Sequence, residues 1–188
     1  MNTPIHSETH GQYTIKIFQD MDAQNPRGDS EPLGTIYHTH RNYDLGERLT
    51  CEDIQAIVEN DSFISLPVYI YDHGNIMLSC GGFSRPWDNG QVGIIAVEKA
   101  KLLKKWNRKK WSKKLELQVI KCLQSEIETF SDYLSGDVYG FVIEKATHCD
   151  SCKHDDAEQI DSCWGFIGDY KYCLAEAKAN LPSEAVAA

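Results

Sequence analysis

The chain has 188 residues, of which 41% are hydrophobic and 25% are charged, as in an ordinary globular protein. No run of about 18 apolar residues is present, which excludes a membrane-spanning helix, and residues 1–12 lack the basic start and apolar centre of a secretory signal. The formal net charge is −9 and the seven cysteines are an odd number, so we expect an acidic cytoplasmic protein with reduced thiols.

In chain order, the first half of the sequence predicts strands and one short helix. Alternating apolar residues predict a strand at 13–18 and another at 33–38. Thr50 is placed to cap a helix over 50–59, with Ile54, Ile57 and Val58 facing inward. Two further strands, 66–71 and 75–80, flank a turn in which Gly74 supplies a positive φ. The apolar run 91–97 predicts a central strand.

The second half predicts a long helix, a hairpin and a final helix. Apolar residues at helical spacing predict a helix over 112–134 that Gly136 ends. Strands at 138–144 and 159–167 should pair, joined by a loop over 145–158. A helix over 169–180 follows, with its inward face formed by Tyr172, Leu174 and Ala175.

This order of elements predicts an α+β fold. We expect one mostly antiparallel sheet of about six or seven strands, with one long and two shorter helices. A chain of this length suits a single domain, which we place at 13–180, between a flexible N-terminus at 1–12 and a disordered tail at 181–188.

One segment carries a strong positive charge. Residues 99–114, here called the basic segment, hold 9 of the 19 basic residues and no acidic residue, whereas the rest of the chain holds 10 basic and 28 acidic residues, a net charge of −18. Such charge segregation steers encounters with charged partners.

The candidate binding residues lie in this segment and in one turn before it. They are Lys104, Lys105, Trp106, Arg108, Lys109, Lys110 and Trp111, together with Trp87 in a Pro-Trp-Asp-Asn-Gly turn. Lysines with interleaved tryptophans suit the binding of nucleic acid. The same residues could instead dock on an acidic protein or on a second copy of this chain. The alternative without binding is a solvated helix face, on which the lysine stems cover half-buried tryptophans.

A Cys-x-x-Cys pair suggests a metal site. Cys149, Cys152 and His154 are candidate zinc ligands, because tetrahedral zinc takes thiolates and imidazoles. A fourth ligand at a recognised spacing is missing, so a surface loop that binds nothing is the alternative.

Two histidines alternate near the end of a predicted strand. His38 and His40 should point to the same side, and Asp72 and His73 in the predicted hairpin turn could approach them. These four residues are candidates for a small enzyme site acting on a phosphorylated or nucleotide ligand. No nucleophile elbow, P-loop, HExxH or GxGxxG motif accompanies them, so polar side chains satisfied at a sheet edge are the simpler interpretation.

The chain resembles a group of small proteins encoded by phages and plasmids. The resemblance rests on Pro-Trp-Asp-Asn-Gly-Gln-Val-Gly at 86–93, Gly-Asp-Val-Tyr-Gly-Phe-Val-Ile-Glu at 136–144 and Asp-Ser-Cys-Trp-Gly-Phe at 161–166, and it extends to 40–46 and 66–73. It implies no activity and no functional residues, and 145–158 looks like an insertion relative to the group. It does imply a context in which acidic accessory proteins block host machinery, including restriction and CRISPR systems, some by imitating DNA.

Three hypotheses follow from these observations. The leading one is a non-enzymatic accessory protein that binds and inhibits a host protein, for example a nucleic-acid-binding defence enzyme. The second is a nucleic-acid-binding module that uses the basic segment, with or without zinc. The third is the small enzyme with His38, His40, Asp72 and His73 in its site.

Overall fold

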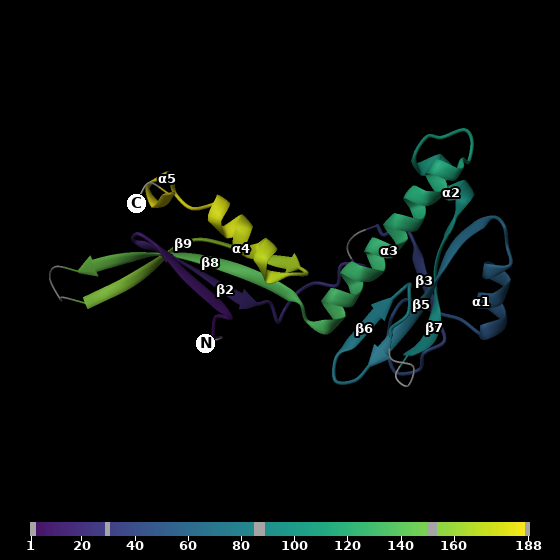
Figure 1. Ribbon diagram of the computed structural model, residues 1–188, viewed down its shortest axis with the longest axis horizontal. Helices are drawn as coiled ribbons and strands as arrows, with labels where there is room; N and C mark the ends of the chain where they lie inside the picture. Colours follow the sequence, from purple (N-terminus) through teal and green to yellow (C-terminus); the bar gives the residue numbers. More distant parts are fainter. Residues whose placement is uncertain (1–2, 29–30, 85–88, 150–153, 187–188) are drawn as a thin grey trace. The chain divides into compact units, whose positions relative to one another are not determined.

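A computed structural model describes residues 3–28, 31–84, 89–149 and 154–186. The chain forms two compact units (Figure 1): unit 2 is the continuous segment Asn25–Ser135, and unit 1 combines Met1–Gln24 with Gly136–Ala188. Each unit has its own hydrophobic core. The single domain predicted for 13–180 therefore consists of two units, the second inserted into the first.

Unit 1 is a four-stranded antiparallel sheet in the order β1-β2-β8-β9, covered on one face by helix α4. Its strands are β1 (His6–His10), β2 (Tyr13–Gln19), β8 (Val138–Cys149) and β9 (His154–Ile167); α4 (Tyr170–Ala179) and the single-turn α5 (Ser183–Val186) follow. Alternate residues of β2 and β8 face α4: Tyr13, Ile15, Ile17, Phe141 and Ile143. They form the core together with Cys173 and Ala177 of α4.

Two segments of unit 1 differ from the sequence-based expectation. Residues 6–10, expected to be flexible, form β1, and residues 145–158, expected to be a loop, mostly extend the hairpin of β8 and β9. Residues 156–161 of β9 are exposed. Neither segment shows the apolar alternation of a half-buried strand, because their side chains are largely polar.

Helix α4 has the predicted extent but a different inward face. Its N-cap is Asp169, whose carboxylate accepts a hydrogen bond from the Lys171 amide at 2.9 Å. Cys173 and Ala177 are the buried residues, whereas Tyr172 is 57% exposed. Of the predicted inward face of Tyr172, Leu174 and Ala175, only Leu174 packs against the core. Tyr172 and Ala175 are exposed, because the two small residues, one helical turn apart, allow α4 to lie closer to the sheet.

Unit 2 is a five-stranded sheet in the order β4-β3-β7-β5-β6, in which only the β3–β4 pair is parallel among the described strands. The strands are β3 (Thr35–His38), β4 (Glu47–Arg48), β5 (Phe63–Asp72), β6 (Ile76–Ser79) and β7 (Asn89–Glu98). The helices are α1 (Cys51–Val58), α2 (Lys99–Lys105) and the long α3 (Lys113–Ser135).

The sheet of unit 2 is covered on both faces (Figure 1). Successive residues of β7 point to opposite sides: Ile95 packs in the larger core with α3, and Ile94 packs in a smaller cluster with Ile54 of α1. The predicted apolar face of α3 is confirmed by its buried residues Leu115, Val119, Leu123, Ile127 and Phe130. On α1, Ile54 is buried as predicted, but Val58 is exposed.

The structure confirms the predicted helix cap and the predicted turn glycines. The Thr50 hydroxyl caps α1 by accepting a hydrogen bond from the Asp53 amide at 3.2 Å, and Gly74 and Gly136 have φ of +92° and +81°. The predicted α+β class, with mostly antiparallel pairing and one long helix, is confirmed; the strands form two sheets instead of one. Among the described residues, no helix has the length and hydropathy needed to cross a membrane.

Candidate functional site

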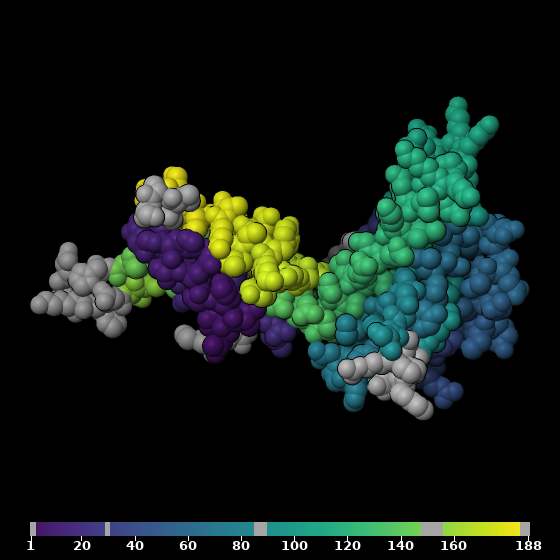
Figure 2. Space-filling view, in the orientation of Figure 1, coloured from purple at the N-terminus to yellow at the C-terminus, as the bar shows by residue number. Residues whose placement is uncertain are grey.

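The basic segment spans α2, the turn after it and the first residues of α3, all within unit 2 (Figure 1). Trp106 closes α2, and Asn107 reverses the chain with a positive φ of 51°. Figure 2 shows the segment in teal and green, standing out from the rest of unit 2. The nine basic residues are therefore gathered on one helix–turn–helix projection.

Three of the nine basic side chains have partners. Lys101 lies 3.9 Å from the carboxylate of Glu98, and Lys105 lies 3.2 Å from that of Glu31. The Lys99 ammonium donates to the carbonyl of Asp61 and lies 5.8 Å from the ring centre of Trp111. Exposed pairs of this kind contribute little stability, typically below about 1 kcal/mol, and a charged partner can replace them at small cost.

The other six basic side chains form no ion pair with any residue that the structure describes. All six are exposed to solvent: Lys104, Arg108, Lys109, Lys110, Lys113 and Lys114. Because few carboxylates neutralise the segment, most of its formal charge remains available to a partner.

The two tryptophans of the segment are anchors rather than exposed platforms. Both are half-buried and pack against the larger core of unit 2. The indole N–H of Trp111 donates to the Glu116 carboxylate at 3.0 Å, and Lys99 lies over its ring. Trp106 lines a cavity of about 460 Å³ with Leu33 and Cys122. These contacts hold the projection to the sheet. Trp87 lies outside the described residues.

Negative charge surrounds the basic segment along the chain. Unit 1 has 13 acidic and 5 basic residues, a net charge of −8. Outside the basic segment, unit 2 has 15 acidic and 5 basic residues, a net charge of −10. The segment's +9 therefore lies within a unit that is otherwise strongly acidic, so unit 2 alone carries a large dipole.

The four residues proposed for an enzyme site are partly brought together. His40 stacks on Tyr43, with ring centres 4.7 Å apart, and the Tyr43 hydroxyl donates to the Asp72 carboxylate at 2.7 Å. This hydrogen bond to Asp72 raises the pKa of Tyr43. His38 is buried at the end of β3, and His73 instead lies near Tyr71, with ring centres 6.2 Å apart. His38 and His40 line one cavity together, and neither Asp72 nor His73 is among the described residues that line it.

Two of the predicted zinc ligands, Cys149 and His154, lie where the described parts of β8 and β9 end and begin. Cys149 and His154 are register partners there, and Cys152 lies outside the described residues. The described part of the chain contains no group of three or more His, Cys, Asp or Glu side chains that could hold a metal. Zinc binding there stays a prediction. If the prediction holds, elemental analysis of protein purified without added metal should find stoichiometric zinc. A Cys149→Ser variant should lose that zinc.

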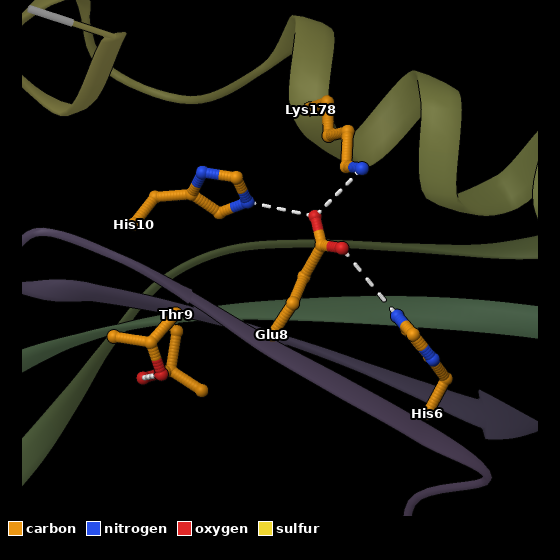
Figure 3. Close-up of polar contacts among 6 residues, drawn as sticks. His6, Glu8, Thr9, His10 and Lys178 are labelled. Atoms are coloured by element: carbon orange, nitrogen blue, oxygen red, sulfur yellow. Dashed lines mark hydrogen bonds and ion pairs between the residues drawn. The ribbon is translucent and has the colours of Figure 1, made fainter.

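Sequence reasoning missed a polar cluster in unit 1 (Figure 3). Glu8 on β1 accepts hydrogen bonds from His10 at 2.7 Å and from Lys178 of α4 at 2.9 Å, and it lies 3.5 Å from His6. Burial alone would raise the pKa of Glu8, but these contacts lower it to about 2. The signal was the His-x-Glu-x-His alternation at 6–10, which places all three side chains on one face of a strand. The cluster fastens β1 to α4.

No protein-family model, curated protein or solved structure matches this chain. The resemblance to phage and plasmid proteins therefore stays a prediction.

Proposed function

We propose that this protein is a non-enzymatic binding protein whose basic segment docks on an acidic surface of a host protein and inhibits it. The observation that carries this proposal is a set of six exposed basic side chains on one helix–turn–helix projection, none of which forms an ion pair with a described residue. Such a surface raises association rates with a negatively charged partner and gives a strong dependence on salt.

An acidic protein surface fits the segment better than single-stranded nucleic acid does. Proteins that bind single strands add exposed aromatic platforms to a basic groove. Here Trp111 is engaged by Glu116 and Lys99, and Trp106 packs against the core. The remaining −10 of unit 2 would also repel a phosphate backbone that extends beyond the segment.

The inhibitory role rests on the resemblance to phage- and plasmid-encoded proteins. Accessory proteins in that context act on host defence systems, so the partner we propose is a nucleic-acid-binding defence enzyme. A nucleic-acid-binding enzyme presents a basic surface to phosphate. The acidic body of this chain is complementary to such a surface, and the basic segment is complementary to an acidic patch beside it.

Charge reversal tests the docking surface. In Lys109→Glu/Lys110→Glu, two exposed, unpaired side chains change sign; in the control Lys121→Glu/Lys171→Glu, the same change of net charge occurs at exposed lysines outside the segment. Tagged wild-type and variant proteins are used for quantitative affinity capture from host lysate, followed by assay of the captured protein's activity. We expect capture and inhibition to be lost in the first variant and kept in the control.

The same proteins separate the alternatives. Retention of DNA or RNA at micromolar protein and low salt, lost only in the first variant, would establish the nucleic-acid-binding module instead. A change from dimer to monomer in the first variant, measured by light scattering, would show that the segment docks on a second copy. Phage plating that is unchanged by expression of the chain, on hosts with restriction, CRISPR and nucleotide-signalling defences, would end the proposal of an inhibitor.

A further inference from the structure

His38 is a buried imidazole whose Nδ1 atom has no hydrogen-bond partner among the described residues. It is only 2% exposed. Buried polar atoms are nearly always paired, and leaving one unpaired costs about 1–3 kcal/mol. His38 is one of two buried polar residues among those described; the other, Ser131, accepts a hydrogen bond from the Leu78 amide at 2.9 Å. The unpaired His38 therefore points to a ligand.

His38 lines a cavity together with two arginines. The cavity has a volume of about 320 Å³ and is also lined by His40, Arg41 and Arg48. Arg48 is the register partner of His38 across the β3–β4 pair, so the two side chains leave the sheet on the same face. Neither arginine forms an ion pair with a described residue, and both also line an adjoining hollow of about 580 Å³, together with Thr39 and Asp53.

The walls of the cavity are fixed by local contacts. The Asn42 amide donates to Nδ1 of His40 at 3.2 Å, and the His40 ring lies nearly parallel to Tyr43, at 12°. Asp72 holds the Tyr43 hydroxyl. Accepting at Nδ1 leaves Nε2 of His40 as the atom that can donate to a ligand. Asp44 also lines the cavity and is the acceptor suited to a ligand hydroxyl.

We propose that this cavity binds a small phosphorylated molecule, with Arg41 and Arg48 holding the phosphate and His38 and His40 donating hydrogen bonds to it. Guanidinium groups match phosphate oxygens in a bidentate geometry, and hydrogen bonds to a charged partner are the strong ones. The Asp44 carboxylate favours a ligand that combines phosphate with hydroxyl groups, such as a nucleotide or a sugar phosphate. The site lies on β3, β4 and their connection, apart in sequence from the basic segment.

Calorimetric titration of the full chain tests this inference, with pyrophosphate and then a nucleoside monophosphate as probes at constant ionic strength. We expect saturable binding that weakens by at least about tenfold in Arg48→Gln, which removes one bidentate contact at an exposed position. The matched control Lys109→Gln/Lys110→Gln should bind as the wild type does. In histidine NMR spectra, the ring resonances of His38 and His40 should move with ligand, whereas those of His73 should not.

Each contrary result has a definite meaning. No heat at millimolar probe, or equal binding by Arg48→Gln and wild type, would overturn the site. Loss of binding in the lysine control alone would place the anion on the basic segment. Sulfate that binds as tightly as pyrophosphate at equal ionic strength would overturn the phosphate assignment. A His38→Gln variant adds a second readout, and Arg48→Gln keeps the test valid if His38→Gln fails to fold.

Discussion

Replacing Glu8 by glutamine tests how the polar cluster holds β1 to α4. Glu8 has a pKa of about 2, below its usual 4.5, because His10, Lys178 and His6 surround its carboxylate against the opposing effect of burial. A drop of that size corresponds to at most about 3–4 kcal/mol, at ~1.4 kcal/mol for each pH unit. The side chain retains 24% exposure, so solvent screening reduces the expected loss of unfolding free energy in Glu8→Gln to about 1–2 kcal/mol at neutral pH.

The contribution of Glu8 to the unfolding free energy depends on pH in a definite direction. The unfolded chain binds a proton at Glu8 before the folded chain does, so the contribution of Glu8 is complete above pH 4.5 and is lost as the pH falls toward 2. Urea unfolding followed by circular dichroism should therefore show a wild-type advantage at neutral pH that shrinks in this acid range. Glu158→Gln, at an exposed position without an ion pair to any described residue, is the matched control. An advantage absent at neutral pH, or one that persists undiminished in acid, would refute the reasoning.

Three further outcomes follow from the structure. A Cβ atom on Gly93 would lie 2.0 Å from the Tyr37 carbonyl oxygen, so Gly93→Ala should lower the unfolding free energy by about 1–3 kcal/mol or more; an unchanged thermal midpoint would contradict this. Ser131→Ala should lower the unfolding free energy by about 1–3 kcal/mol because the buried Leu78 amide loses its acceptor. Ser131→Thr keeps the hydroxyl and should lower the unfolding free energy less, as measured by urea titration. Burial raises the pKa of the Cys173 thiol to about 12, so peptide mapping of briefly alkylated native protein should show the exposed Cys51, Cys122 and Cys163 labelled and Cys173 unlabelled; labelling at equal rates would be the contrary result.

Much of unit 2 was predictable because its elements bury apolar residues with a clear period. The face of α3, the cap at Thr50 and the turn at Gly74 depend on residues close together in the sequence. In unit 1, β1 and the outer half of the hairpin could not be predicted in the same way. Their side chains are polar, and their extended conformation depends on pairing with neighbouring strands and on contacts such as Glu8 with Lys178.

The candidate sites follow the same division. The basic segment was visible because nine charges lie within one continuous stretch. The cavity at His38 was predicted only as a pair of alternating histidines, because the contributions of Arg48 and Tyr43 depend on how β4 and the preceding loop fold against β3. The division of the strands into two sheets also depends on pairing between distant residues, such as Lys16 and Glu144, which are 128 positions apart.

The insertion of unit 2 between β2 and β8 fixes an order of events during synthesis. As the nascent chain leaves the ribosome, the β1–β2 hairpin emerges first, but β8 and α4 are not yet translated. The segment from Asn25 to Ser135 contains every strand and helix of its own sheet, so we expect it to collapse before unit 1 is closed. Until then the apolar face of β2 is uncovered, and chaperone binding to the growing polypeptide should concentrate on that stretch.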